Sequence, residues 1–263
     1  MNAAMVEEIA NAVLYEGYLL YPYRRSAIKN QRRWNFGVVG PSESMQTECL
    51  FQTAAGSTLR VRVRFLHLIG DQAMPRDVEL MYGVGSESYS HHFEFAPLED
   101  QEGIQGRIET HIEQFKVRVT IFNTTPLEGL KRSFISTHTI LSLEEGEFIS
   151  LLETPDEFRE QAAACKNIGT WPVLVGEEDA RDAMLSSPII LYDYPRIAPE
   201  SAGALFDGTE IDEILTLRIM TLTDQEKLEM ASTDARAKEI LDRTESMPPE
   251  QFMKLHGVLR GTR

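Results

Sequence analysis

Four polar residues in the last third of the chain have types that could do chemistry. Asp193 and Tyr194 directly follow the apolar run Pro188–Tyr192, which predicts a buried strand, and a few convergent polar groups are typical of ligand sites. Asp207 and Glu210 come shortly after, where a helix is predicted to begin. Such carboxylates could bind Mg²⁺ or Ca²⁺. Acids in a first helical turn also stabilise the helix dipole, so a purely structural role is the alternative.

A second group of candidate residues lies near the amino terminus, where the sign of the charge reverses. Residues 24–33 contain five bases and no acid, in a chain whose net charge is −15. Tyrosine, tryptophan and arginine contribute most to the binding energy of many protein interfaces. The residues that we predict to bind a partner are Tyr21, Tyr23, Arg24, Arg25, Arg32, Arg33 and Trp34. The alternative is that these bases pair with the chain's own acids.

The histidines and cysteines do not have the spacing of a metal site or of a nucleophile with its base. His91 and His92 are neighbours on a predicted strand, so their side chains point to opposite faces. His138 shares a face with Phe134 and Ile140 and is predicted to be a core or edge residue, not a ligand. Cys49 and Cys165 are far apart and form no Cys-x-x-Cys motif. We therefore expect no bound metal, no cofactor and no disulfide framework.

Composition indicates a globular protein of 263 residues with 42% hydrophobic and 25% charged residues. The net charge of −15 argues against nucleic acid as a partner, because non-specific binding depends on neutralising phosphates. The amino terminus has acids where a signal peptide has bases, and no apolar run is long enough for a membrane span. The expected location is the cytoplasm.

Apolar and polar residues alternate with a period of two from about residue 47 to residue 152, and this pattern predicts antiparallel strands. Leu59–Phe65 alternates apolar residues with arginines, and Phe115–Ile121 has a similar pattern. The other strand candidates are Thr47–Thr53, Val78–Tyr82, His91–Phe95, Ile104–Ile112, Ile135–Leu143 and Phe148–Leu152. A hairpin turn is predicted at residues 144–147. Many short strands with turns between them are typical of a sandwich or barrel.

Helices are predicted on either side of these strands. Residues 3–14 have amphipathic periodicity, and Thr154-Pro-Asp-Glu and Thr223-Asp-Gln-Glu are capping boxes that begin later helices. A short strand is predicted at Pro172–Val175. The predicted fold class is α+β, with an antiparallel β-sandwich-like amino-terminal part followed by a mainly helical carboxyl-terminal part. The predicted domains are 1–40 (helix and basic, tyrosine-rich arm), 41–153 (sandwich) and 154–263 (mixed to helical lobe).

Several segments resemble an uncharacterised bacterial protein family that is encoded with high-affinity uptake [NiFe] hydrogenases and their maturation proteins. The likeness extends from about residue 6 to residue 256. The segments that carry it are Val13-Leu-Tyr-Glu-Gly-Tyr-Leu-Leu-Tyr-Pro-Tyr-Arg, Lys29-Asn-Gln-Arg-Arg-Trp-Asn-Phe-Gly, Ser136-Thr-His-Thr, Gly169-Thr-Trp-Pro-Val-Leu-Val-Gly and residues 185–218. The resemblance implies a pathway and assigns no catalytic residue.

Three functional hypotheses follow. The first is a non-catalytic accessory, assembly or maturation protein, or an auxiliary subunit, of a [NiFe] hydrogenase, whose partner is a hydrogenase subunit or a maturation factor. The second is a metal-assisted enzyme, in which Asp207 or Glu210 binds the cation and Asp193 is the general base. The third is a binding module for a small ligand or peptide. The oligomeric state is left open.

Overall fold

The computed structural model describes residues 3–15, 37–69, 72–85, 87–96, 103–126, 128–196, 216, 219–233, 235–248 and 250. The chain divides into two compact units. The first contains residues 1–14 and 35–195, and the second contains residues 15–34 and 196–263.

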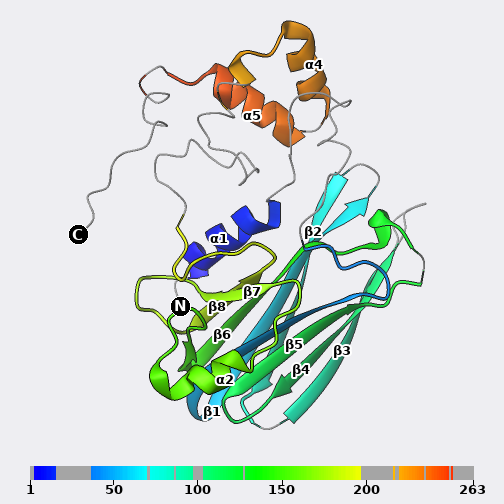
Figure 1. Cartoon of the computed structure of the whole chain (residues 1–263). Coiled ribbons are helices and arrows are strands. Elements are labelled where there is room, and N and C mark those ends of the chain that lie inside the picture. Colours follow the sequence, from blue (N-terminus) through cyan, green and yellow to red (C-terminus); the bar gives the residue numbers. More distant parts are fainter. Residues whose placement is uncertain are drawn as a thin grey trace. The chain divides into compact units, whose positions relative to one another are not determined.

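The first unit is built on one antiparallel sheet of eight strands (Figure 1). The strands are β1 (Ser44–Ile69), β2 (Gln72–Gly83), β3 (Glu87–Phe95), β4 (Ile104–Ile112), β5 (Lys116–Asn123), β6 (Ile135–Ile149), β7 (Trp171–Leu174) and β8 (Ala183–Ser187). Their order is β3-β4-β5-β1-β6-β8-β7, and β2 pairs with β1 beside this path. The sheet curls until it is nearly closed, so its shape is barrel-like.

β1 and β6 are long because each continues through residues that suggest a turn. The pairing of β1 with β6 shifts between Thr53 and Thr58, and Gly56 there has a φ of 92°. On the opposite strand Glu145 has a φ of 60°, and its carbonyl oxygen accepts a hydrogen bond of 2.8 Å from the Ser57 hydroxyl. The predicted hairpin turn at residues 144–147 is therefore wrong. Gly56 and Glu145, which both have positive φ, lie opposite each other at this irregularity, and the two strands bend there as a pair.

The predicted fold class, a sandwich-like amino-terminal part followed by a mainly helical carboxyl-terminal part, is also wrong. One continuous sheet replaces the sandwich, and it extends beyond residue 153, because β8 pairs with β6 and β7 pairs with β8. Between β6 and β7 lie only the short helices η3 (Asp156–Phe158) and α2 (Arg159–Ala163); η2 (Leu130–Arg132) precedes β6. The Thr154 hydroxyl bonds the carbonyl oxygen of Ser150, so the predicted capping box does not form there.

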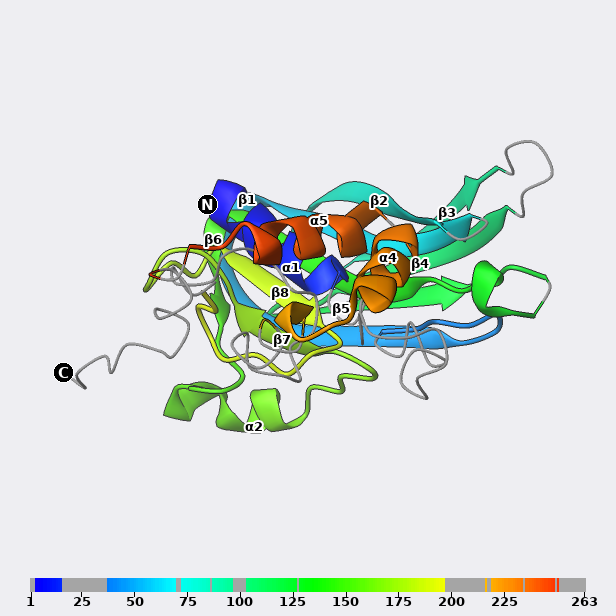
Figure 2. The same ribbon diagram turned by 90° about the horizontal axis from the view of Figure 1, so that it is seen from above.

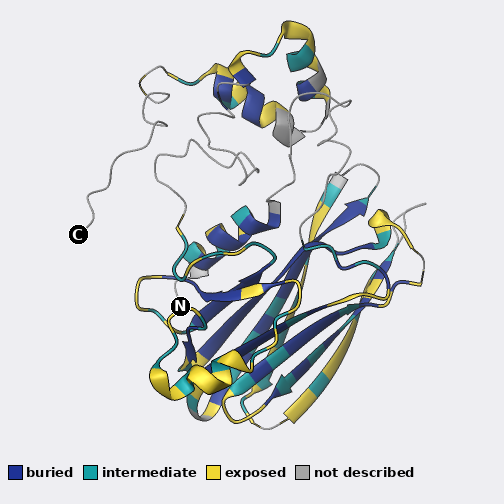
Figure 3. Ribbon diagram, in the orientation of Figure 1, coloured by how far each residue is buried: buried dark blue, intermediate teal, exposed yellow. Residues whose placement is uncertain are grey.

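The core lies inside the curled sheet. Its largest buried side chains are aromatic, and Phe65 stacks on Phe134 with ring centroids 4.5 Å apart. The alternation predicted for Leu59–Phe65 is confirmed: the apolar residues are fully buried, whereas the arginines lie on the outer face. There Arg60 pairs with Glu79 of β2 at 2.7 Å. Figure 3 shows the same alternation of buried and exposed positions along the strands.

Helix α1 (Ala3–Tyr15) covers part of the outer face of the sheet, and its predicted position is confirmed (Figure 2). Val6, Ile9 and Val13 pack on apolar residues of β6 and β8. The polar side of the helix is also used, because Glu7 pairs with Arg62 of β1 at 2.9 Å. The helix is therefore attached by an apolar stripe and by an ion pair at its border.

The described residues of the second unit include two helices, α4 (Asp224–Thr233) and α5 (Ala235–Glu245). The capping box predicted at Thr223 is confirmed: the Thr223 backbone N–H donates to the Glu226 carboxylate at 2.9 Å, and the Glu226 N–H donates to the Thr223 hydroxyl at 3.3 Å. Lys227 joins the two helices by pairing with Glu245 at 2.8 Å. No helix in the described ranges is long and apolar enough to cross a membrane.

Candidate functional site

Asp193 holds the segment after β8 against β7 and the end of β6. One carboxylate oxygen accepts a hydrogen bond of 2.7 Å from the backbone N–H of Leu174, and the other accepts one of 2.5 Å from the Ser150 hydroxyl. Ser150 Oγ in turn accepts hydrogen bonds from the backbone N–H groups of Leu152 and Glu153, at 3.1 and 2.8 Å. Both oxygens of Asp193 thus have structural partners.

Tyr194 completes this attachment. Its backbone N–H donates to the carbonyl oxygen of Leu174 at 2.8 Å, so Asp193 and Tyr194 together occupy both backbone groups of one β7 residue. Tyr194 has a φ of 56°, and its ring packs against the core. Burial raises the pKa of its hydroxyl above the ordinary value of 10.0. The two residues predicted as a polar site therefore act together, as a clamp on the edge of β7.

We expect Asp193→Asn to destabilise the first unit by about 1 to 2 kcal/mol, because an amide nitrogen cannot accept the hydrogen bond from Ser150. Chemical denaturation followed by circular dichroism measures the loss. Removal of a catalytic carboxylate would leave stability unchanged or raise it, since functional sites are often built at a cost in stability. An unchanged unfolding midpoint would therefore contradict the clamp.

The segment before this clamp is not the strand that was predicted. Pro188–Tyr192 forms no strand, and β8 lies immediately before it. Ile190 and Tyr192 are 72% and 86% exposed, and Trp171 at the start of β7 is 45% exposed. Trp171 pairs with the last residue of β8, so these three apolar side chains lie on adjoining segments. Exposed large apolar and aromatic side chains are common at contact surfaces.

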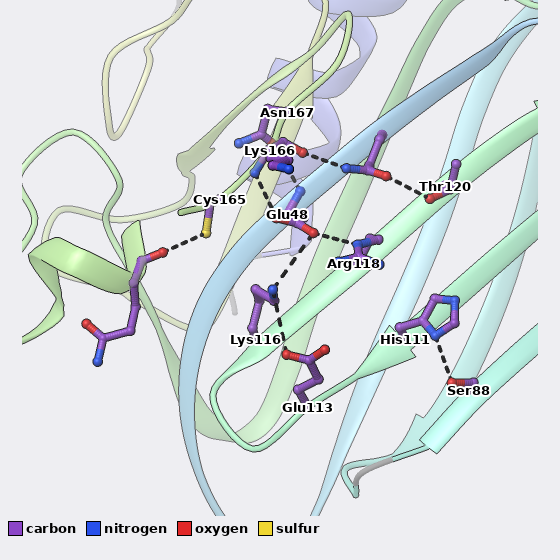
Figure 4. A network of polar contacts seen from close by, with 12 residues as sticks. Glu48, Ser88, His111, Glu113, Lys116, Arg118, Thr120, Cys165, Lys166 and Asn167 are labelled. Carbon is purple, nitrogen blue, oxygen red and sulfur yellow. Dashed lines mark hydrogen bonds and ion pairs between the residues drawn. The ribbon is translucent and has the colours of Figure 1, made fainter. Parts of the chain in front are cut away.

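A buried carboxylate, Glu48, is the centre of a polar network on the outer face of β1 (Figure 4). It is 1% exposed. Its Oε1 accepts a hydrogen bond of 2.5 Å from Arg118 Nε and lies 3.9 Å from Lys116 Nζ, and its Oε2 accepts one of 2.7 Å from the backbone N–H of Lys166. The backbone N–H of Glu48 donates to the side-chain oxygen of Asn167 at 2.8 Å. The network fastens the segment after α2 to the sheet.

The charges around Glu48 favour its ionised form. Burial raises the pKa of this carboxyl group, but the hydrogen bonds from Lys166 and Arg118 and the nearby positive charge of Lys116 lower it more, so the pKa lies below its ordinary value of 4.5. Glu48 is therefore ionised and fully partnered at neutral pH. The sequence pattern did not predict this network, because alternation along the strand places Glu48 on the outer face and does not show that another segment covers it.

His138 of β6 is fully buried. Its Nδ1 donates to the carbonyl oxygen of Ser136 at 2.8 Å. Burial, together with the neighbouring positive charges of Arg64 and Arg62, lowers the pKa of His138 from 6.5 to about 3. The imidazole is therefore neutral over the physiological range. With its strand partner Arg64 beside it, the ring stands next to a cation and is poorly placed to bind a metal ion.

The two cysteines are both free thiols and differ in burial. Cys49 is fully buried in the core, and burial raises the pKa of its thiol. Cys165 follows α2, donates to the carbonyl oxygen of Gln161 at 3.5 Å, and has a pKa raised by burial to about 11. Both thiols are therefore protonated at neutral pH, which disfavours their use as nucleophiles.

Several predicted residues lie outside the described part of the chain. They are Tyr21, Tyr23, Arg24, Arg25, Arg32, Arg33, Trp34, Asp207 and Glu210. In the described ranges, no group of three or more histidine, cysteine, aspartate or glutamate side chains is arranged to hold a metal ion. A hollow of about 170 Å³ lies beside α1, but the arginines that line it, Arg60 and Arg62, are paired with acids.

No protein-family model matches this chain, and no curated protein matches it.

Proposed function

We propose that this chain is a non-catalytic accessory protein that assembles, matures or joins a [NiFe] hydrogenase in the cytoplasm. It acts by contact with a hydrogenase subunit or a maturation factor, and it uses no cofactor of its own. The pathway comes from the sequence resemblance. The observation that carries the contact role is the exposure of Trp171, Ile190 and Tyr192 on adjoining segments beside the Asp193 clamp.

The Asp193 geometry favours this role over a metal-assisted enzyme. A general base needs a carboxylate oxygen within reach of a substrate proton. Both oxygens of Asp193 instead accept short hydrogen bonds from the protein, at 2.7 and 2.5 Å. The same contacts rigidify the segment that carries Ile190 and Tyr192, and a rigid aromatic surface loses little entropy when it binds.

Affinity purification of the tagged chain from its native host, followed by mass spectrometry, tests the proposal. We expect near-stoichiometric recovery of hydrogenase subunits or maturation factors. Recovery of the chain alone, as a monomer or homo-oligomer, would contradict the accessory role and return attention to Asp207 and Glu210.

Two substitutions locate the contact surface. We expect Trp171→Ala combined with Tyr192→Ala to reduce partner recovery about tenfold, because exposed aromatic residues dominate interface energies. Phe115→Ala is the matched control, since Phe115 lies in the turn between β4 and β5 and is 46% exposed, like Trp171 at 45%. Equal recovery with both variants would exclude this surface.

The basic arm gives a separate prediction. Charge reversal by Arg32→Glu and Arg33→Glu should abolish partner capture and leave the unfolding midpoint unchanged, because interface charges steer and align binding partners. Capture that persists in this variant would remove the arm from the interface without affecting the result for Trp171.

A further inference from the structure

β3 ends the sheet with a long unpaired edge. In the described part of the chain its backbone pairs with β4 alone. The strand at the other end of the order, β7, has only four residues, contains Pro172, and is clamped at Leu174 by Asp193 and Tyr194. Unpaired N–H and C=O groups along an edge can pair with a strand of another molecule. Of these two ends, only β3 offers a long edge for such pairing.

One face of β3 provides apolar support beside this edge. Tyr89, Phe93 and Phe95 are half-buried and pack against the core. The ring of Tyr89 stacks on Tyr82 of β2 at 4.3 Å, and the guanidinium of Arg76 lies 4.9 Å from the ring centroid of Phe95. β2 and β3 thus touch through side chains, although no ladder joins them among the described residues. Side chains of an added strand would pack on these rings.

The rest of β3 is exposed. Six of its nine residues are exposed, and Figure 3 shows this strand as the most exposed edge of the sheet. Among them are Glu87 and Glu94, near the two ends of the strand. These exposed positions leave much of β3 accessible to a binding partner, whereas Tyr89 and Phe95 contact β2.

Charge specifies the kind of partner. Residues 71–102 carry eight acids and a single base, Arg76, so this stretch holds a large part of the net charge of −15. Two of the acids on β2 are neutralised by arginines of β1. Glu87 and Glu94 belong to none of the ion pairs of the described residues. Within the described ranges, the edge therefore presents two carboxylates that no ion pair neutralises, next to half-buried aromatic rings, and the Glu87 carboxylate accepts a hydrogen bond from the Tyr89 hydroxyl.

From the free edge, the aromatic support and the acidic charge, we propose that β3 binds an extended, basic segment of a partner protein as an added strand. The segment alternates basic and apolar residues: the apolar ones pack on the face of Tyr89, Phe93 and Phe95, and the basic ones lie on the opposite face beside Glu94. Glu87, at the first position of the strand, lies on the aromatic face and adds negative charge at that end. Main-chain hydrogen bonds provide the affinity and side chains the selectivity, as in other cases of strand addition. This inference rests on the proposed accessory function and names the chemistry of its partner.

The first experiment uses the full chain and a synthetic nine-residue peptide of alternating lysine and valine, which matches the nine residues of β3. Fluorescence anisotropy measures binding, and hydrogen–deuterium exchange locates it. We expect saturable binding, weakened by salt, with slower exchange at residues 87–95. A glutamate–valine peptide and a lysine–valine peptide with alternate residues replaced by proline should not bind, because the first is repelled and the second cannot donate to the edge.

Charge reversal tests the two glutamates. Glu87→Lys combined with Glu94→Lys should weaken peptide binding at least about tenfold. The control is Glu157→Lys combined with Glu160→Lys, which changes the net charge equally at two exposed positions in η3 and α2. Thermal unfolding of both variants checks the fold. Should the β3 variant unfold, Glu94→Gln alone replaces it, with weaker binding still expected.

Several outcomes would overturn the inference. They are equal binding of the control peptides, binding without protection of β3, and equal loss in both charge variants. If none of the peptides binds, the acids of β3 serve only to prevent aggregation and the inference is wrong. Binding that appears only after Arg32→Glu and Arg33→Glu would show that the chain's own basic segment occupies the edge. Self-association that is lost with Glu94→Gln would assign the edge to a second copy.

Host purification separates this inference from the proposed function. If wild-type chain captures its partner and the Glu87→Lys, Glu94→Lys variant captures as much, the edge is not the docking site and the accessory function stands. If the wild-type chain captures nothing, the accessory function fails. The peptide experiment then decides by itself whether β3 binds a basic strand.

Discussion

Glu48→Gln is expected to lower the free energy of unfolding by about 3 kcal/mol, because it leaves a buried donor facing another donor. The carboxylate is 1% exposed and accepts hydrogen bonds from Arg118 and from the backbone of Lys166 on different oxygens. The amide of glutamine retains one acceptor, and its nitrogen must face the other N–H group. The Arg118 side chain is 36% exposed, so water can hydrate it when the carboxylate is replaced. We therefore expect a loss no larger than about 3 kcal/mol.

Denaturation as a function of pH distinguishes this effect from a packing defect. The pKa of Glu48 is lowered in the folded protein, so its ionisation stabilises the fold above the ordinary value of 4.5, and this contribution is lost as pH falls through the lower, folded value. The difference between wild type and Glu48→Gln should be constant near neutral pH and should shrink below about pH 4.5. A difference that is independent of pH would contradict the charge argument.

The matched control is Glu113→Gln. Glu113 contacts the same network through Lys116 at 3.6 Å, but its side chain is 63% exposed. Exposed ion pairs contribute little, so we expect a change below about 0.5 kcal/mol. A large effect of this control would mean that the whole network, and not the buried carboxylate, stabilises the attachment of α2.

Gly106→Ala is expected to destabilise the first unit by about 2 to 3 kcal/mol through overpacking. Gly106 of β4 pairs with Phe93 of β3, whose ring lies over it. An added Cβ would lie 2.2 Å from Phe93 Cζ and 2.8 Å from Phe134 Cζ. These rings also contact each other and Phe65, with centroids 5.6 and 6.0 Å from that of Phe93, so none can move without disturbing the core.

Gly83→Ala provides the control for this substitution. Gly83 ends β2, and a Cβ added there meets no atom within 4 Å. Loss of glycine flexibility in the unfolded chain should make this variant neutral or slightly more stable. Chemical denaturation of both variants measures the difference, and equal stability would show that the Phe93 ring yields easily. Such mobility would also weaken the case for β3 as a preformed docking edge.

Local patterns in the sequence determined much of the secondary structure. The predicted strand Ile104–Ile112 matches β4, and the alternation of Leu59–Phe65 correctly separates buried from exposed residues. The predicted helix at residues 3–14 and the capping box at Thr223 are also confirmed. These features depend on side chains within a few residues of each other, so periodicity and capping chemistry are sufficient to predict them.

The tertiary structure alone decided how these elements are used. Residues 144–147 have turn composition, yet they lie within β6, because its pairing with β1 continues past the bend. The apolar run Pro188–Tyr192 is exposed, because Asp193 ties its end to β7. Glu48 is buried because the segment after α2, more than a hundred residues away, covers it. Each outcome depends on contacts between distant segments, and local alternation contains no information about which distant segment will cover a given face.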